Sequence, residues 1–517
     1  MKKPTILLFL LLITSFLYAQ APTITWAKNF GGARSDFGRS VVVTDDNKYV
    51  VAGGILSKEN DTIIRPTGLD AWVVKLDANG NMLWQKTYGG TGDDSATKIV
   101  QTADKGFIIV GESRSNTGDF ITNKGNFDAW VFKIDSLGNL EWQKTFGGSD
   151  DDYTSSVIQT KFGEYIINAT SRSKDGDFPE NNGEEDVWIL KLNSRGNLIW
   201  KKHLGGNSND FNRDIVNVDD LSYLVIGTTR SEDGDMNNFK GNFIFKIDSS
   251  GKMLWKKSHG NLYNDASYFN GYYSAAITKN KDIIVIGYVW IFLGVPNRHD
   301  LHDFHISKLD SDGNYIWSKL YGGSDADIAR SIQISPKGDL IILGDTNSKD
   351  YDIEGSHGKT DMWLLKTDSI GELIYKMCLG GTSWDYSKQC AITKDNSIII
   401  VGDSQSIDGT FGRNNGIVDL AVAKISDPFL TSIKEDKPIL DINIYPNPLS
   451  NHLNIDNNFT SNLDIQLVNI LGQTVFKGLC HQGKHTIDVS HLSNGLYILI
   501  GKDGKNNSFS KAITIQR

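Results

Sequence analysis

Carboxylates recur at two fixed places in this chain, where they could hold a cation, accept amide hydrogen bonds or transfer protons. An aspartate stands five residues after the first residue of a repeated Gly-Gly pair, which one repeat replaces by Gly260-Asn261. The members of this first series are Asp36, Asp94, Asp152, Asp210, Asp265, Asp327 and Asp385. A second series opens a later apolar segment of each repeat at Asp70, Asp128, Asp186, Asp303, Asp361 and Asp419, with Gly241 as the exception.

Two interpretations of these aspartates compete. A residue that returns in every repeat serves what every repeat shares, so the acceptance of backbone N–H bonds in a turn is the favoured role. The alternative is a ring of carboxylates that binds a cation or a polyol. Because a catalytic site needs asymmetry and these positions are symmetric, they are assigned no catalytic role.

Further acidic residues lie in long loops rich in Asp, Asn, Gly and Ser. The triplet DGD occurs at Asp175 to Asp177 and again at Asp233 to Asp235. This composition is compatible with calcium, but neither triplet continues into the spaced ligand pattern that ends in a bidentate glutamate. Ordinary polar turns are therefore favoured, and calcium stays as the alternative cofactor.

Three histidines, His299, His302 and His305, follow one another at intervals of three and suggest a metal site at first sight. His305, however, takes a strand position that other repeats fill with Trp72, Trp130, Trp188 and Trp363, and strand side chains alternate faces. An aromatic patch that stacks on a sugar or seats a partner is favoured over a metal, and a packed loop is the plain alternative. No Ser-His-Asp arrangement, phosphate loop or HExxH helix is readable, so no catalytic, cofactor-binding or metal residue is assigned.

The segments that must position these residues form a repeat. Its anchors are Trp26, Trp84, Trp142, Trp200, Trp255, Trp317 and, weakened, Tyr375, at steps of 58, 58, 58, 55, 62 and 58 residues. One unit contains ATKIVQT, GFIIVGES, AWVFKID and LEWQKTFGG, four short apolar segments bounded by Gly, Asn or Asp, which predict four strands. A long regular period of this kind indicates a propeller or array.

The two ends of the repeat predict how it closes. The chain enters at ITWAKNFGG, a fourth strand without the first three, and leaves at DLAVAKISD, a third strand without a fourth. Pairing of the two would remove an open sheet edge. The sequence thus predicts an all-β, seven-bladed β-propeller of four-stranded blades over residues 23–427, closed by an N-terminal strand. Its long loops between second and third strands share one face, where repeat proteins place recognition.

The N-terminus and the overall charge bear on location and partners. Lys2 and Lys3, an apolar run and Ala19 predict a signal peptide over residues 1–19, read by the Sec translocon. No later run of ~20 apolar residues exists, so no transmembrane segment is expected in the mature chain. The formal net charge is −9, and loss of the two lysines takes it to −11, which argues against nucleic acid and anionic membranes. Cys378 and Cys390 could pair across neighbouring strands, although free thiols are favoured.

A different module follows a charged linker at residues 428–441. Over residues 442–517, alternating apolar segments and glycine turns predict a small β-sandwich. Its motifs are Tyr445-Pro446-Asn447-Pro448, Ile470-Leu471-Gly472-Gln473, Leu492-Ser493-Asn494-Gly495-Leu496-Tyr497, and Lys511 ahead of an apolar final strand. In this order they resemble the type A C-terminal sorting domain of type IX secretion cargo, with Gln473 where many members have arginine. The resemblance implies the type IX secretion machinery as a partner and a secreted or surface-attached product, often with removal of the tail.

The ring itself resembles the glycine-rich β-propeller repeats found upstream of such tails, a resemblance that supplies no active site. The sequence therefore predicts an exported binding or adhesion module for a glycan or protein. An extracellular polysaccharide hydrolase or lyase is the alternative, and a structural spacer in a surface layer is the third class.

Overall fold

The computed structural model describes residues 21–56, 68–119, 123–237, 239, 241–258, 269–290, 302–428, 443–445, 450–457, 462–469, 474–503 and 508–517. The chain divides into two compact units, residues 1–430 and 431–517. The predicted signal peptide and all but the first residue of the predicted linker lie outside the described residues. Among the described residues, no helix is both long and apolar enough to span a membrane.

In the described part of the first unit, the strands form seven four-stranded antiparallel sheets. The first strands are β2 (Asp36–Val43), β6 (Asp94–Gln101), β10 (Asp152–Gln159), β14 (Asp210–Asp219), β18 (Phe269–Ile277), β22 (Asp327–Ile334) and β26 (Asp385–Ile392). The second strands are β3 (Tyr49–Ile55), β7 (Phe107–Ser113), β11 (Tyr165–Ser171), β15 (Ser222–Thr229), β19 (Ile283–Trp290), β23 (Leu340–Thr346) and β27 (Ser397–Ser404).

The outer half of each sheet follows the same order. The third strands are β4 (Asp70–Leu76), β8 (Asp128–Ile134), β12 (Asp186–Leu192), β16 (Gly241–Asp248), β20 (His302–Leu309), β24 (Asp361–Thr367) and β28 (Asp419–Ser426). The fourth strands are β5 (Met82–Tyr88), β9 (Leu140–Phe146), β13 (Leu198–Leu204), β17 (Met253–Lys257), β21 (Tyr315–Tyr321), β25 (Leu373–Leu379) and, in the last blade, β1 (Thr23–Phe30). Two short 3-10 helices, η1 (Gly234–Met236) and η2 (Gly409–Phe411), lie in loops after second strands.

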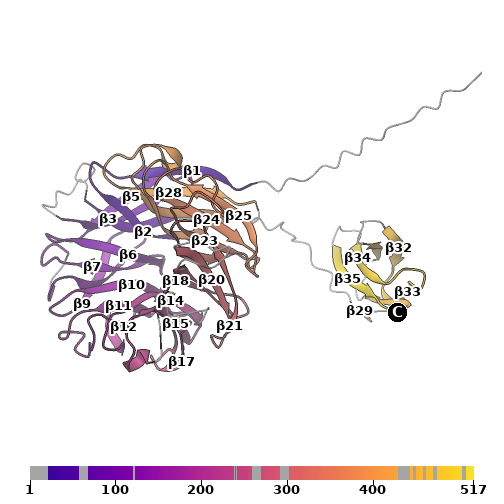
Figure 1. Ribbon diagram of the computed structural model, residues 1–517, viewed down its shortest axis with the longest axis horizontal. Coiled ribbons are helices and arrows are strands. Elements are labelled where there is room, and N and C mark those ends of the chain that lie inside the picture. Colours follow the sequence, from indigo (N-terminus) through magenta and orange to yellow (C-terminus); the bar gives the residue numbers. More distant parts are fainter. Residues whose placement is uncertain are drawn as a thin grey trace, which may run out of the picture. The chain divides into compact units, whose positions relative to one another are not determined.

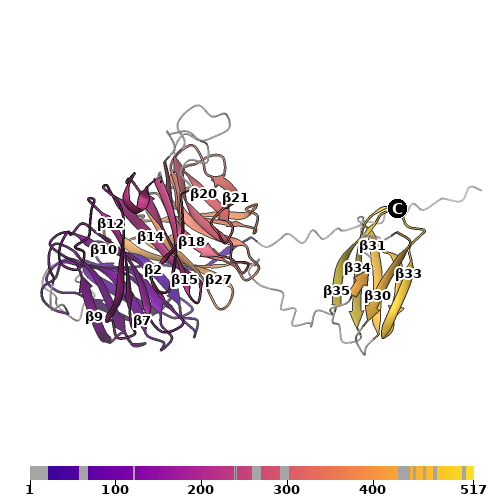
Figure 2. The ribbon, with the colours of Figure 1, turned by 90° about the horizontal axis from the view of Figure 1, so that it is seen from below.

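The seven sheets close into a ring, and we number these blades 1 to 7 in chain order, from the sheet that starts with β2 to the sheet that starts with β26. Each first strand packs against the first strand of the next blade, and β26 packs against β2. Figure 1 shows the fourth strands β9, β17, β21 and β25 toward the rim and the first strands β6, β10, β14 and β18 nearer the centre, and Figure 2 shows the same unit after a quarter turn. The predicted propeller of four-stranded blades is confirmed.

The last blade is completed by the start of the chain. Strand β1 pairs antiparallel with β28, from Phe30 opposite Leu420 to Thr23 opposite Ser426. The outer edge of β28 is thereby hydrogen-bonded instead of being open to another chain. The predicted closure by an N-terminal strand is confirmed.

Burial within a blade depends on the position of the strand. Every residue of β8, a third strand, is buried, whereas β9 beside it is exposed along much of its length. The core is shared between blades, since Val50 and Val73 of blade 1 cluster with Phe107 and Phe132 of blade 2. Because a neighbouring sheet covers each face, the inner strands are continuous apolar runs and their burial holds the ring together.

The tryptophan anchors connect each blade to the next one. Trp26 lies against Gly80 of the hairpin between β4 and β5, where an added Cβ would meet the indole at 2.8 Å and where φ is +74°. Glycine is therefore required there by both space and backbone conformation. The same contact joins Trp84 to Gly138, Trp142 to Gly196, Trp200 to Gly251, Trp255 to Gly313 and Trp317 to Gly371. Tyr375 instead donates its hydroxyl to Asp427 (3.0 Å).

The described residues of the C-terminal unit form two antiparallel sheets. One has the order β29-β30-β33 and the other β32-β31-β34-β35. Their bounds are β29 (Asn443–Tyr445), β30 (His452–Asn457), β31 (Leu463–Asn469), β32 (Thr474–Cys480), β33 (Gly483–Asp488), β34 (Gly495–Asp503) and β35 (Ser508–Ile515). Residues from both sheets, such as Leu453, Leu467 and Leu499, share one core. Since strand side chains alternate faces, each sheet turns one apolar face inward, and the predicted small β-sandwich is confirmed.

Candidate functional site

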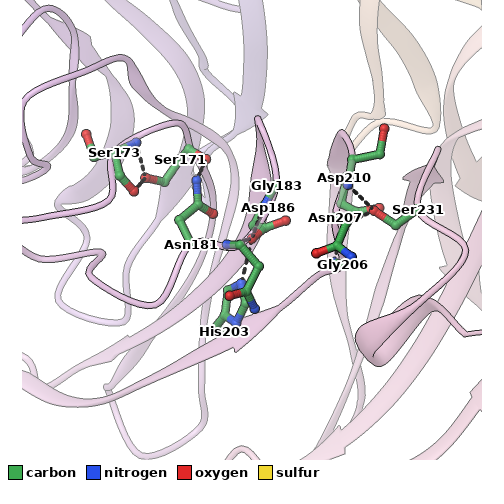
Figure 3. Close-up of polar contacts among 12 residues, drawn as sticks. Ser171, Ser173, Asn181, Gly183, Asp186, His203, Gly206, Asn207, Asp210 and Ser231 are labelled. Atoms are coloured by element: carbon green, nitrogen blue, oxygen red, sulfur yellow. Dashed lines mark hydrogen bonds and ion pairs between the residues drawn. The ribbon is translucent and has the colours of Figure 1, made fainter.

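The first series of aspartates lies at the junctions between blades. Asp210, at the start of β14, accepts the N–H of Gly206 (2.9 Å) and the hydroxyls of Ser231 (2.8 Å) and Thr229 (Figure 3). The same N–H bond, from the second residue of the Gly-Gly pair, is accepted by Asp36, Asp94, Asp152, Asp327 and Asp385. These are the contacts of a structural carboxylate.

Blade 5 departs from this series. The pairing of β18 with β19 sets Asn270 opposite Val289, which is the position where the first strands of the other blades begin with aspartate. Asp265, which residue counting places in the series, lies outside the described residues. The register therefore assigns the junction position of blade 5 to Asn270.

The second series of aspartates lies beside the first at the junctions whose blades carry both residues. The N–H of Asn182 binds Asp186 Oδ2 at 2.7 Å, and His203 Nε2 lies 2.8 Å from the same oxygen (Figure 3). Asp128, Asp361 and Asp419 accept equivalent N–H bonds from Lys124, His357 and Asn415.

The first glycine of each Gly-Gly pair lies between two aspartates, one from each series. A Cβ on Gly89 would lie 2.4 Å from Asp70 Oδ1 and 2.6 Å from Asp94 Oδ2. Any side chain at this position would therefore push apart the carboxylates of the residues with which β4 and β6 begin. Glycine is required here by the close approach of the backbone.

The DGD triplets fasten the long loops to these junctions. Asp175 accepts the N–H of Ser149 (2.7 Å), and Asp177 accepts the N–H of Gly147 (3.0 Å). Asp233 likewise accepts the N–H of Asn207 (2.8 Å). The carboxylate oxygens thus bind backbone amides of the Gly-Gly turn, as Asp side chains do in turns.

Burial at the junctions changes the protonation of the aspartates. It raises the pKa of Asp128, Asp152, Asp210 and Asp327 from the ordinary value of 3.8 to about 6, although hydrogen bonds from hydroxyls and amides oppose the shift. Between these two values the folded chain holds protons that the unfolded chain has lost. These four groups therefore lower the free energy of unfolding as the pH rises from about 4 to about 6.

We expect the melting temperature of the ring to be roughly 5 °C lower at pH 7.5 than at pH 5, which calorimetry at constant ionic strength would measure. Asp152→Asn should flatten this dependence because it removes one of the titrating groups. Asp312→Asn, in an exposed hairpin, is the matched control and should leave the dependence unchanged. A melting temperature that is constant or rises over this interval would contradict the assignment.

The two described histidines of blade 5, His302 and His305, make different contacts. His305 is buried, stacks on Tyr272 with ring centroids 6.1 Å apart, and has Nε2 2.9 Å from the hydroxyl of Ser307. It pairs with Gly287, as Trp130 pairs with Gly111 in blade 2, so it fills a tryptophan position of the core. His302 contacts the ring of Tyr288 edge-on, and burial lowers its pKa. His299 lies outside the described residues, which contain no cluster of three His, Cys, Asp or Glu side chains placed to hold a metal.

The three cysteines and several motif residues of the tail lie within the described residues. Cys378, Cys390 and Cys480 are free thiols. Tyr445 ends β29, Gly495 begins β34 and Lys511 is exposed on β35. Tyr497 is buried and donates its hydroxyl to the carbonyl of Ser493 (2.9 Å). Pro446, Asn447, Pro448 and Gly472 lie outside the described residues.

A cavity of about 450 Å³ lies on the ring axis, lined by residues from all seven first strands. Each first strand has a register shift there, so that one residue is left unpaired with the second strand. The bulged residues are Arg39, Thr97, Ser155, Arg213, Tyr273, Arg330 and Lys388, and all seven line the cavity. A bulge re-aims its side chain, here toward the axis.

The cavity lies toward the face that carries the long loops. Each bulge falls three residues after the start of its strand, or four in β18, next to the connection from the preceding blade. Glu112, which also lines the cavity, is the last residue but one of β7, immediately before a long loop. The cavity is therefore close to the variable loops that could complete a binding surface.

Charges around the cavity are mostly positive. Five basic and two acidic residues line it. Arg330 Nε lies 2.9 Å from Asp345, and Lys388 Nζ lies 3.2 Å from Asp403. Burial raises the pKa of Glu112, whose carboxylate accepts the hydroxyls of Ser95 and Thr97 (3.1 Å from Thr97). The cavity is thus asymmetric within a symmetric ring.

Residue patterns alone missed this site, although a signal for it exists. Three residues after each junction aspartate, the side chain changes from blade to blade among Arg, Thr, Ser and Lys. The junction aspartate repeats and therefore serves every blade, whereas the residue three positions after it varies and therefore has a role that the blades do not share. Its location on the axis depends on the bulge and on closure of the ring, neither of which the spacing shows.

Comparison with known proteins identifies the C-terminal unit. Residues 443–516 match the family described as secretion system C-terminal sorting domain. The regulatory protein FlaEY of Caulobacter vibrioides is 24% identical over 236 residues, which is 40% of this chain and 23% of FlaEY. The chain thus spans less than a quarter of the length of that relative.

Solved structures with a similar arrangement include three with low sequence identity. A fungal alcohol oxidase of the AA5 family in complex with copper has 12% identity and a TM-score of 0.44, with 96% of this chain and 100% of that chain covered. PorZ, a bacterial surface component of the type IX secretion system of Porphyromonas gingivalis, has 10% identity and a TM-score of 0.33, covering 91% and 68%. An α-L-arabinanase of Penicillium chrysogenum complexed with arabinobiose has 10% identity and a TM-score of 0.39, covering 79% and 99%.

The seven four-stranded sheets identify the first unit as a propeller. The motifs, the sandwich fold and the family match identify the second unit as a sorting domain. The second unit is the signal by which type IX secretion recognises its cargo. The chain is accordingly a β-propeller protein with a type IX secretion sorting domain at residues 443–516, and it is secreted or attached to the cell surface.

Proposed function

We propose that the exported propeller is a binding or adhesion module that captures a glycan or a protein on its long-loop face, with the axial cavity as the anchoring site. The observation that carries this proposal is the asymmetry of the cavity, since its seven bulged residues differ while the junction residues repeat. Its volume of about 450 Å³ is within the range of small-molecule sites. The variable loops around it would add contacts with the rest of the ligand.

The test is retention of the purified chain on a panel of immobilised polysaccharides and surface proteins, with and without calcium, together with an assay for released oligosaccharides. Retention without products is the expected result. Tyr273→Ala should weaken retention because the ring lines the cavity, whereas Tyr315→Ala, on the exposed rim strand β21, should not. No retention on any member of the panel would favour a spacer and count against the proposal.

A second candidate function is cleavage of an extracellular polysaccharide, either by hydrolysis or by the elimination reaction of a lyase. The observation in its favour is Glu112, a cavity carboxyl whose pKa is raised by burial and which could donate a proton. Release of oligosaccharides by the native chain, lost in Glu112→Gln with retention preserved, would establish this function in place of simple binding.

A further inference from the structure

The basic residues of the axial cavity occupy one continuous arc of the ring. Blades 4, 6, 7 and 1 contribute Arg213, Arg330, Lys388 and Arg39, and blade 5 places Tyr273 between the first two. The bulged residues of blades 2 and 3 are the neutral Thr97 and Ser155, and blade 2 also contributes Lys98 and Glu112. Blade 3 is therefore the hydroxyl side of the cavity, and cations stand on most of the other blades.

Two of the five cations, Arg330 and Lys388, are already neutralised within their own blades. Arg330 pairs with Asp345 (2.9 Å), and Lys388 pairs with Asp403 (3.2 Å). Both carboxylates also accept N–H bonds from the next blade, Asp345 from Ser387 and Asp403 from Gly38. These pairs therefore build the wall of the cavity.

Arg213 and Arg39 differ from these two paired cations. Within the described residues, neither has a carboxylate at ion-pair distance, and both side chains are exposed toward the axis. The Arg213 guanidinium lies 4.9 Å from the centre of the Tyr273 ring, and Arg39 lies 4.7 Å from that of Phe37. Stacking on an aromatic ring fixes the plane of a guanidinium and leaves its N–H groups available at the edge.

The acidic residue beside Arg213 is committed elsewhere. Asp214 accepts the hydroxyls of Ser156 and Ser274, both at 2.9 Å, and thereby joins blade 4 to both neighbours. Its oxygens are thus occupied by structural donors, and Arg213 keeps an unmatched charge in the cavity. In a chain of net charge −9, this local positive field would attract an anion.

The hydroxyl side of the cavity suits a ligand rich in hydroxyl groups. Ser155 donates to Asn212 Oδ1 (2.6 Å), and Thr154 donates to the carbonyl of Gly111 (2.8 Å). With their protons used in this way, both hydroxyl oxygens can accept hydrogen bonds from a ligand. The ring of Tyr273 is itself covered by the guanidinium groups of Arg213 and Arg330, at 4.9 and 4.6 Å from its centre, so it orients these cations.

We propose that the axial cavity recognises the carboxylate group of an acidic sugar, held by the planar guanidinium group of Arg213, with Arg39 adding positive charge from across the cavity. A carboxylate presents two oxygens in one plane and matches the fork of a guanidinium, and the sugar hydroxyls donate to Ser155 and Thr154 of blade 3, next to Arg213. This inference rests on the proposed binding function and names the ligand class for the same cavity.

The test is isothermal titration of the full exported chain with trigalacturonate, and with a neutral and a sulfated trisaccharide of equal length. Trigalacturonate should bind and the other two should bind at least about tenfold more weakly. Arg213→Gln should weaken the binding of trigalacturonate about tenfold or more, because one charge-assisted hydrogen bond is lost. Arg195→Gln, which removes an equal charge from an exposed hairpin, is the matched control and should bind like the native chain.

The outcomes separate this inference from the proposed function. Equal binding of the neutral trisaccharide would overturn carboxylate recognition and leave saccharide binding in place. Equal binding of the sulfated trisaccharide, or tighter binding of poly-glutamate, would overturn the acidic sugar as the ligand. Binding of no saccharide would overturn the inference, and the panel of polysaccharides and proteins would then decide whether the binding function itself stands. These comparisons use the native chain, so they hold even if Arg213→Gln fails to fold.

Discussion

A chain that ends at Asp427 is expected to fold its ring and accumulate in the periplasm instead of reaching the cell surface. The ring and the tail are separate compact units, so removal of the tail leaves the seven sheets intact. The secretion machinery loses the sorting domain that it recognises at residues 443–516. Surface labelling of intact cells of a type IX-secreting host, compared with periplasmic extracts, would measure the shift.

The reciprocal experiment is the control for this prediction. Residues 428–517 fused to a fluorescent reporter with its own signal peptide should bring the reporter to the cell surface. The same fusion with Tyr497→Ala tests whether the folded sandwich is needed, because Tyr497 is buried in its core. Surface display of the truncated ring would show that export depends on something other than the tail.

Deletion of Thr23–Phe30 is expected to destabilise the ring strongly. The deletion removes seven residue pairs with β28 and the packing of Trp26 and Phe30 against the core shared by the last and first blades. It also removes the contact between Trp26 and Gly80, which joins these two blades. Loss of this apolar burial is worth roughly 5 kcal/mol. The melting temperature should fall by roughly 5 to 10 °C, and the uncovered edge of β28 should promote aggregation.

A permuted chain provides the matched rescue. Thr23 lies opposite Ser426 in the register, so a short glycine-containing turn after Asp427 could lead directly into a transplanted copy of β1. This construction reproduces the hairpin that other blades have between third and fourth strands, and it should restore most of the lost stability. An unchanged melting temperature after the deletion would mean that β1 does not hold the ring closed.

Together, these two experiments distinguish the residues that direct export from the residues that stabilise the ring. Truncation of the tail should change where the protein is found and leave its melting temperature the same. Deletion of β1 should change the stability of the ring without altering the sorting domain. A variant that changed both would indicate a dependence between the units.

Much of the fold follows from local pattern. The spacing of tryptophan and glycine predicts the four-stranded repeat, because each indole packs on a hairpin glycine about one period away. The incomplete repeats at Trp26 and Asp419 predict the closure by β1. The motifs around Tyr445 and Tyr497 predict the sorting domain. In the ring, a short stretch of residues makes a contact that recurs at six of the seven anchors.

Insertions set one limit to such counting. The junction position of blade 5 is held by Asn270, whereas residue spacing points to Asp265. The register of β18 with β19 depends on which backbone groups pair, and a one-dimensional spacing does not contain that information.

The ring, its closure and its sorting signal follow from the sequence, since these features depend on periodic burial and on short motifs. The candidate site follows only from the folded ring. Arg39 and Arg213 are 174 positions apart in the sequence and come to one cavity because seven sheets close in a circle and each first strand bulges at the same level. No local propensity encodes that convergence, which arises from the packing of every blade against the next.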